Sequence, residues 1–158
     1  MRTMPKSAAW ALKRDLVHSP YFQGLPEKVL EEMVPFFRQR SFAKGAIILK
    51  ENSRARLLFI LCKGTVALSI RRGEGELVME IVKKKGALFG WSAVVSPRKY
   101  TASAKALENC RVLSIQGKDM ERLFQRYPSF GLLFLQRLSS LIATRLHSTR
   151  SLLAETLS

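Results

Sequence analysis

The chain has 158 residues, of which 47% are hydrophobic, and it carries a net charge of +15. The length predicts one domain, or one domain with helical arms, and the hydrophobic fraction is ample for a core. The charge favours an acidic partner, such as nucleic acid, an anionic membrane surface, an acidic protein or a phosphorylated ligand, with a merely solubilising basic surface as an equal alternative.

Several classes of protein are excluded by what the sequence lacks. The two cysteines, Cys62 and Cys110, and the two histidines, His18 and His147, do not have metal-ligand spacing, so we expect no metal site and two buried free thiols. No secretory signal and no run of 18 apolar residues is present, which predicts a cytoplasmic protein without a transmembrane segment. No carboxylate pair or nucleophile–base arrangement indicates an enzyme.

Two short helices are expected before the strands begin. Residues 4–17 have apolar side chains at helical spacing, and Ser19-Pro20 ends this helix. Pro26 and Glu27 then open a second helix whose apolar face continues to Phe37.

Between Arg40 and Ile115 the pattern changes to short strands separated by glycine turns. Residues 66–70 alternate apolar and small side chains, which is typical of a half-buried strand, and residues 77–82 return from a hairpin tip at 73–76. The near-regular spacing predicts a mainly β protein with flanking helices, namely an antiparallel β-roll of the jelly-roll (double-stranded β-helix) type.

The helical period resumes after Gly117. Residues 119–124 predict a short helix, and a long helix follows from about residue 129 to near residue 157. The long helix carries an apolar stripe at spacings of three and four, which favours a homodimer seam over packing on the chain's own domain. The stripe consists of Leu135, Leu138, Ile142, Leu146, Thr149, Leu153 and Leu157.

Residues 86–104 are the most informative segment. Gly86 and Gly90 frame a short apolar turn, a helical turn of small residues follows, and a basic loop with Pro97 leads into small hydroxyl residues at 101–104. Glycines let backbone N–H groups approach a ligand closely, and the N-terminus of a helix attracts an anion. The segment therefore predicts a binding site for a small anion.

Four segments of the chain form a pattern together with their order and spacing: Phe42-x-x-Gly45-x-x-Ile48, residues 58–66, Gly86-x-x-Phe89-Gly90 and residues 101–106. On these segments, residues 20–150 resemble cyclic-nucleotide-binding domains of the catabolite-activator type. The resemblance implies a β-roll with N-terminal helices and a long C-terminal helix, a sensor without catalytic activity, and a phosphate-binding cassette at residues 86–104. Transcription factors of this family also carry a helix-turn-helix domain, which we do not expect within residues 1–158.

The resemblance also implies which residues contact a ligand. Those on the cassette and its following strand are Phe89, Gly90, Trp91, Ser92, Arg98, Tyr100, Thr101 and Ala102, and those on the long helix are Thr149 and Arg150. The ligand would be a cyclic nucleotide or another small phosphorylated anion. By position along the chain, residues 1–24 form an N-terminal helical arm, 25–116 a helix and the β-roll, and 117–158 the short helix and the long dimerisation helix.

Two side chains depart from the family pattern. Trp91 stands where members that bind cyclic AMP or cyclic GMP have an acidic residue for the ribose 2′-hydroxyl, and Tyr100 stands where they have the arginine that neutralises the phosphate. An indole cannot accept that hydrogen bond, and a phenol has neither the positive charge nor the paired N–H donors of a guanidinium. Because each lost charge-assisted hydrogen bond costs roughly 1.5–3 kcal/mol, we expect weak or no binding of either nucleotide.

Three functions remain open at this point. The first is a ligand-sensing regulatory module in which a small anion binds the cassette and the long helix shifts against the β-roll, with Trp91 either stacking on a planar part of the ligand or filling the pocket. The second is a nucleic-acid-binding protein that uses charge alone, with Lys83-Lys84-Lys85 and nearby arginines on one basic face. The third is a protein-interaction module whose pocket is vestigial because Trp91 fills it.

Overall fold

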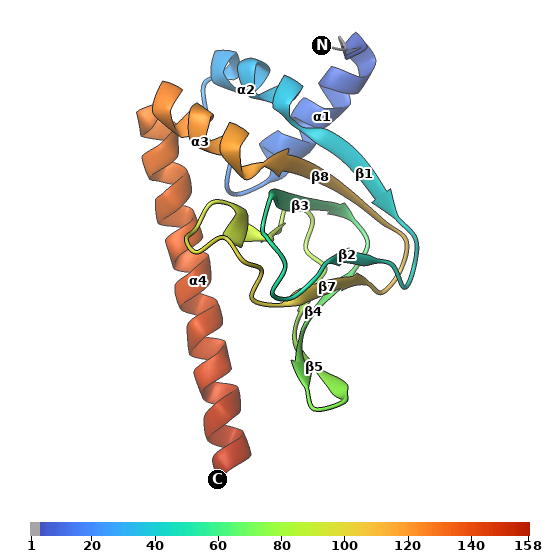
Figure 1. Cartoon of the computed structure of the whole chain (residues 1–158). Helices are drawn as coiled ribbons and strands as arrows, with labels where there is room; N and C mark the ends of the chain where they lie inside the picture. The colour runs from blue at the N-terminus through green and yellow to red at the C-terminus, as the bar shows by residue number, and fades with distance from the viewer. Residues whose placement is uncertain (1–3) are drawn as a thin grey trace.

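The computed structural model describes residues 4–158 and contains two four-stranded sheets with helices at one end and along one side (Figure 1). The helices are α1 (Lys6–His18), α2 (Glu27–Met33), α3 (Gly117–Arg126) and α4 (Pro128–Leu157), with 3-10 turns η1 (Val34–Phe36) and η2 (Trp91–Ala93). The strands are β1 (Arg38–Phe42), β2 (Ile47–Leu49), β3 (Leu57–Lys63), β4 (Val66–Arg72), β5 (Gly75–Val82), β6 (Leu88–Phe89), β7 (Ser103–Ala106) and β8 (Cys110–Gln116).

Both sheets are antiparallel throughout. Their strand orders are β1-β8-β3-β6 and β2-β7-β4-β5, so strands distant in the sequence lie side by side. The register sets Leu58 of β3 opposite Ile115 of β8, and Val66 of β4 opposite Ala106 of β7. The predicted β-roll with flanking helices is confirmed.

The core is continuous from the β-roll to the helices at its end. Strand β3 is buried from Leu58 to Cys62, and residues 57–61 of the sequence form a continuous apolar run. Between the helices, Phe22 lies with its ring centroid 5.7–5.9 Å from those of Phe37, Phe130 and Phe134. Aromatic pairs at these distances add to the free energy gained by burial. Both cysteines are buried free thiols.

One buried carboxylate attaches α1 to the β-roll. Asp15 is 4% exposed, and its Oδ2 lies 2.7 Å from the Nη1 atom of Arg111 on β8. Lys85, from the lysine run before the cassette, places its Nζ 3.8 Å from Oδ1 of the same carboxylate. Of the expected N-terminal arm (1–24), residues 1–3 lie outside the described residues, and α1 contributes Leu12 and Leu16 to the common core.

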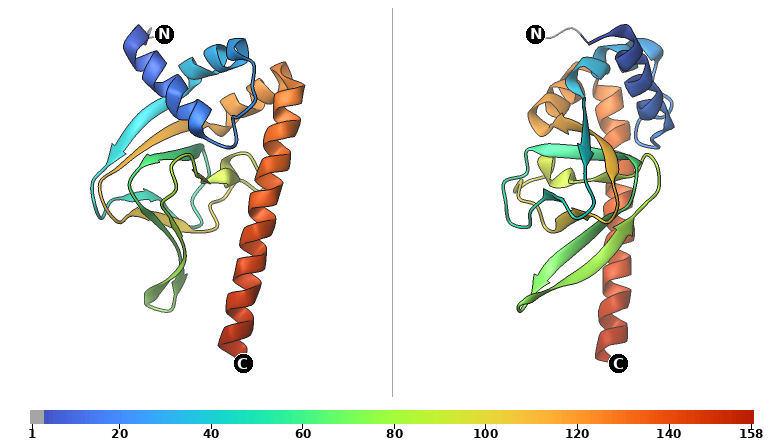
Figure 2. Two further views of the ribbon diagram at one scale, coloured as in Figure 1. Left: turned by 180° about the vertical axis from the view of Figure 1, so that it is seen from behind. Right: turned by 90° about the vertical axis from the view of Figure 1, so that its right-hand side faces the viewer.

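Helix α4 runs along one side of the β-roll, and its C-terminal half projects in the same direction as the β4–β5 hairpin (Figure 2). Its first turns are buried through Phe130, Phe134 and Leu138. Leu138 was expected in the exposed seam, but it is 1% exposed and belongs to the chain's own core. The other leucines of the stripe are 40–78% exposed, namely Leu135, Leu146, Leu153 and Leu157. Within residues 4–158, no helix has both the length and the apolar character needed to cross a membrane.

Candidate ligand-binding site

The cassette turn is built on a strand pair and a glycine. Strand β6 pairs with β3, and the Phe89 ring stacks on the Phe59 ring with centroids 5.2 Å apart. Gly90 follows with φ +74°, in the left-handed region that favours glycine. A Cβ at Gly90 would lie 3.1 Å from the Phe59 ring and 3.2 Å from the carbonyl oxygen of Leu57. The backbone angle therefore favours glycine, the tight space opposes a Cβ, and the chain turns here into η2.

A cavity of about 750 Å³ lies between the β-roll, the cassette turn and α4. This volume is within the range of small-molecule sites, roughly 300–1,000 Å³. From the roll its wall includes Leu49, Leu68, Ile70, Met79 and Glu80, and from α4 it includes Leu141, Ile142, Thr144, Arg145, Leu146, Ser148 and Thr149. The cassette and the strand after it contribute Gly90, Trp91, Ser92, Tyr100, Thr101 and Ala102. The cavity is thus mostly apolar, with hydroxyl-bearing side chains on both the α4 side and the cassette side.

Arg145 connects α4 to the cassette across this cavity. Its guanidinium carbon lies 4.2 Å from the centroid of the Trp91 ring, which is within cation–π distance. Its Nε lies 2.5 Å from Oε2 of Glu80 on β5, and its Nη2 donates to the Leu88 carbonyl oxygen at 3.5 Å. Burial lowers the pKa of Arg145 below its ordinary value, and the Glu80 carboxylate opposes that shift. One side chain of α4 thus contacts three other elements, namely η2, β5 and β6.

Tyr100 lines the cavity with its ring, but its hydroxyl is bound to backbone. The O–H donates to the Leu57 carbonyl oxygen at 2.6 Å and accepts from the Leu57 N–H at 3.2 Å. The side chain is 7% exposed, and burial raises the pKa of the phenol. Tyr100 therefore holds the start of β3 and offers no charge to a ligand.

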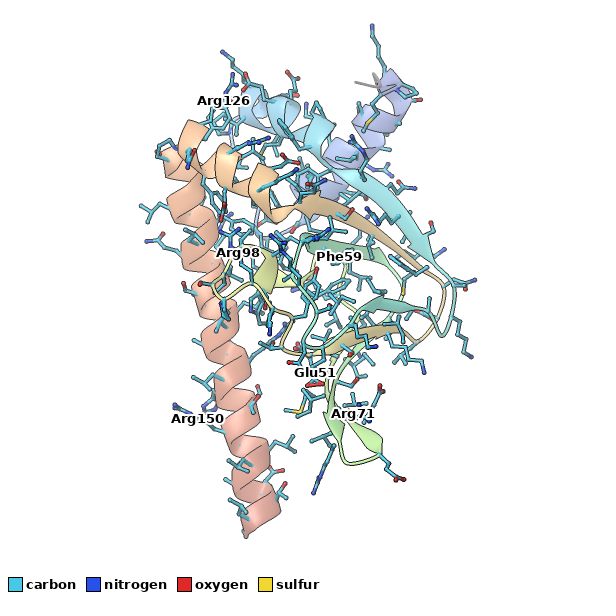
Figure 3. The ribbon with its side chains drawn as sticks, viewed as in Figure 1. Glu51, Phe59, Arg71, Arg98, Arg126 and Arg150 are labelled. Carbon is cyan, nitrogen blue, oxygen red and sulfur yellow. The ribbon has the colours of Figure 1, made fainter. Side chains whose placement is uncertain are left out.

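Three of the expected contact residues lie outside the cavity wall. Phe89 is fully buried against Phe59. Arg98 lies on the loop that follows the cassette turn and pairs with Glu121 of α3 (Figure 3). Arg150 is exposed on the side of α4 that faces away from the β-roll (Figure 3). The remaining seven surround the cavity, and their contact with a ligand stays a prediction.

The charges in the wall balance one another. Among the wall residues, only Glu80 and Arg145 carry charge, and they form an ion pair. An anion entering the cavity would meet no cation that is free of a carboxylate. Around the cassette turn the wall thus presents an indole, a phenol whose hydroxyl is bound to backbone, and an arginine paired with a carboxylate.

Comparison with known proteins agrees with this architecture. The family described as "Cyclic nucleotide-binding domain" matches residues 39–127, which is more than half of the chain. The chain belongs to this family.

Relatives within the family share the fold across most of the chain. The cyclic AMP receptor protein of Thermus thermophilus is 27% identical over 128 residues, or 81% of this chain and 57% of that protein. The crystal structure of the catabolite activator protein of Thermus thermophilus superposes with a TM-score of 0.71 at 26% identity, covering 87% of this chain and 63% of that one. A cyclic nucleotide-binding domain from Methylobacillus flagellatus gives a TM-score of 0.78 at 17% identity, covering 96% and 86%, which supports the fold alone.

This cyclic nucleotide-binding domain spans just over half the length of its Thermus relative, and 27% and 30% of two bacterial potassium channel proteins that it also matches. Several wall residues were not among the expected contact residues, and the most consequential of them is Arg145, whose side chain is 17% exposed. The available signal was its position four residues from both Leu141 and Thr149, on the same face of the long helix.

Proposed function

We propose that this domain is a non-catalytic ligand-sensing regulatory module whose ligand enters the cavity between the β-roll, the cassette turn and α4. Cyclic AMP and cyclic GMP bind it weakly or not at all. What supports this proposal is that the cavity persists beside Trp91 while its wall lacks an unpaired cation. The persistence of about 750 Å³ beside the indole argues against a vestigial pocket that Trp91 fills.

The cost of the missing cation follows from the wall. A cyclic phosphate placed at the cassette turn would lie near the Tyr100 ring, whose hydroxyl is held by Leu57. Recruiting Arg145 instead would require separating it from Glu80 and from the Trp91 face. Since a hydrogen bond to a charged group contributes roughly 1.5–3 kcal/mol, the loss of the arginine contact alone weakens binding about ten- to hundredfold.

The occupant that fits this wall is a planar, largely apolar molecule with little or no net negative charge. Trp91 supplies a ring for stacking, and Leu49, Leu68 and Ile142 supply apolar surface. Thr144 and Thr149 on α4 supply hydroxyl groups that orient the ligand's polar atoms. Such a ligand needs no cation to replace the family's arginine.

Ligand binding in the cavity would change the position of α4 through the contacts of Arg145. A ligand that stacks on Trp91 competes with the guanidinium for the same ring face, so binding changes how α4 is held against β5 and the cassette. The exposed leucines of α4, with Leu146 and Leu153 at their centre, would form the seam of a homodimer that reads this change. A cytoplasmic location also remains part of the proposal.

A ligand screen by thermal unfolding tests the function. The panel contains cyclic AMP, cyclic GMP and a set of planar aromatic molecules, neutral and anionic, each at millimolar concentration. A ligand at 100 times its dissociation constant adds about 2.7 kcal/mol to the stability of the folded state, which raises Tm by several degrees. We expect shifts with uncharged planar molecules, and a Tm raised by micromolar cyclic AMP would contradict the proposal.

Fluorescence locates the binding event. The chain has two tryptophans, and Trp10 is 63% exposed and outside the cavity wall. The variant Trp10→Phe therefore leaves Trp91 as the single tryptophan. A ligand in the cavity should change Trp91 emission at the concentrations that raise Tm. A Tm shift with unchanged Trp91 emission would place the ligand elsewhere and refute this site.

A further inference from the structure

A second hollow, separate from the cavity described above, is lined by basic side chains. It measures about 490 Å³ and lies where β1, the loop before β3, the loop after the cassette turn and the start of α3 meet. Five of its lining residues are cations, namely Arg40, Arg54, Arg56, Arg98 and Lys118, and none of the lining residues is an aspartate or glutamate. This hollow therefore has a net positive charge, whereas the two charges in the cavity wall cancel.

Most of this charge has no carboxylate partner. Within the part of the chain that the structure describes, Arg98 alone of the five forms an ion pair, with Glu121. This contrasts with Lys13, Arg111, Arg126 and Arg145 elsewhere in the fold, each of which lies within 4 Å of a carboxylate. Four like charges around one recess repel one another unless an anion binds between them.

The backbone that carries these side chains is held in place. The Ala55 N–H donates to the Arg98 carbonyl oxygen at 2.8 Å, and the Gly117 N–H donates to the Arg56 carbonyl oxygen at 2.9 Å. On β1, Arg40 Nε donates to Ser114 Oγ at 3.0 Å. The loop before β3 is thus tied to the loop after the cassette turn and to the start of α3, and β1 is tied to β8, so an anion would not have to order these segments before binding.

We propose that this hollow is a binding site for a small polyanion that carries two or more phosphate groups. A guanidinium group can donate two parallel hydrogen bonds to the oxygens of one phosphate. Arg54 and Arg56 belong to one short loop, and both line this recess. The recess is concave and the size of a small molecule, whereas a nucleic-acid duplex needs cations spread along a groove or face. The site does not depend on what occupies the cavity beneath α4.

Calorimetric titration with inorganic tripolyphosphate tests this site. The comparison is between the unaltered chain, the double variant Arg54→Ser with Arg56→Ser, and a matched control, Lys83→Ser with Lys84→Ser. Both variants lose two positive charges, and all four side chains are exposed. We expect the arginine variant to bind tripolyphosphate roughly ten- to hundredfold more weakly and the lysine control to stay within about twofold of the unaltered chain.

Further variants separate the possible explanations. Arg54→Lys with Arg56→Lys keeps the charge but loses the paired N–H donors of the guanidinium groups. Its affinity for tripolyphosphate should therefore lie between those of the unaltered chain and the serine variant, and it remains informative if the serine variant fails to fold. Equal weakening in the arginine and lysine variants would show general charge attraction and overturn the site. Absence of binding to the unaltered chain at millimolar tripolyphosphate would also overturn it. So would binding of a 20-nucleotide single strand that depends on Arg54 and Arg56 and that saturating tripolyphosphate does not displace.

Discussion

Replacing Arg145 with methionine removes the contact between α4 and the cassette turn while keeping most of the apolar stem. The guanidinium lies 4.2 Å from the Trp91 ring centroid, and a part-buried cation–π contact contributes about 1–2 kcal/mol. The ion pair with Glu80, whose side chain is 37% exposed, adds less than about 1 kcal/mol after solvent screening. The 3.5 Å hydrogen bond to Leu88 is too long to contribute much.

These contributions predict a loss of about 1–3 kcal/mol in the free energy of unfolding for Arg145→Met. For a chain of this size each kcal/mol lowers Tm by roughly 2–4 °C, so the variant should unfold several degrees earlier. Circular dichroism at 222 nm measures the transition, and Trp91 emission reports the loss of the cation from its ring face.

Arg150→Met is the matched control because it lies on the same helix and is exposed. It should change the free energy of unfolding by less than about 0.5 kcal/mol. Equal Tm values for Arg145→Met and Arg150→Met would refute the argument that Arg145 holds α4 against the cassette. A double-mutant cycle with Trp91→Leu should then give a coupling energy near zero rather than the predicted 1–2 kcal/mol.

Three other predictions follow from single positions. Gly90→Ala should lower the free energy of unfolding by about 1–3 kcal/mol, because the φ of +74° and the nearby Phe59 ring both oppose a Cβ. Urea unfolding measures this change, and an unchanged urea midpoint would contradict the described turn. Burial raises the pKa of Cys62 from 9.0 to about 11, so the unfolded state loses the thiol proton first and the free energy of unfolding should fall as pH rises from about 9 to 11. Cys62→Ala should lose less stability over that interval, and parallel curves of unfolding free energy against pH for the two proteins would contradict this assignment. Leu153→Glu should shift sedimentation toward the monomer if the exposed face of α4 is a homodimer seam, and an unchanged sedimentation coefficient would remove that face from the interface.

Most of the β-roll could be predicted because its buried strands have strong patterns. The apolar run at 57–61 corresponds to β3. The alternation at 66–70 corresponds to β4, but residues 66–69 are all buried, so the expected half-buried strand is wrong in its burial because its small side chains also lie in the interior. Strand β1 was only partly expected, because Arg38–Phe42 is nearly all polar and exposed at a sheet edge, where hydrogen bonds to β8 rather than burial define it. The two-residue strand β6 is too short to carry a period at all.

The site was predictable where a backbone requirement determines the residue and unpredictable where long-range contacts do. Gly90 is identified by its turn, and the family pattern locates Trp91 and Tyr100 next to it. The pattern does not show that the Tyr100 hydroxyl binds Leu57, which is distant in the sequence, or that Arg145 reaches Trp91 from α4. Both contacts depend on how the helix and the loop pack in three dimensions.

Under the proposed function, the cavity is present but its wall offers a cyclic phosphate no cation that is free of a carboxylate. The most direct measurement is calorimetric titration of cyclic AMP into the unaltered chain and into Tyr100→Arg, with Tyr100→Phe as the control for losing the hydroxyl bonds to Leu57. We expect no detectable heat of binding from the unaltered chain or from Tyr100→Phe at millimolar cyclic AMP, and a measurable affinity in Tyr100→Arg. Micromolar binding of cyclic AMP to the unaltered chain would contradict the account.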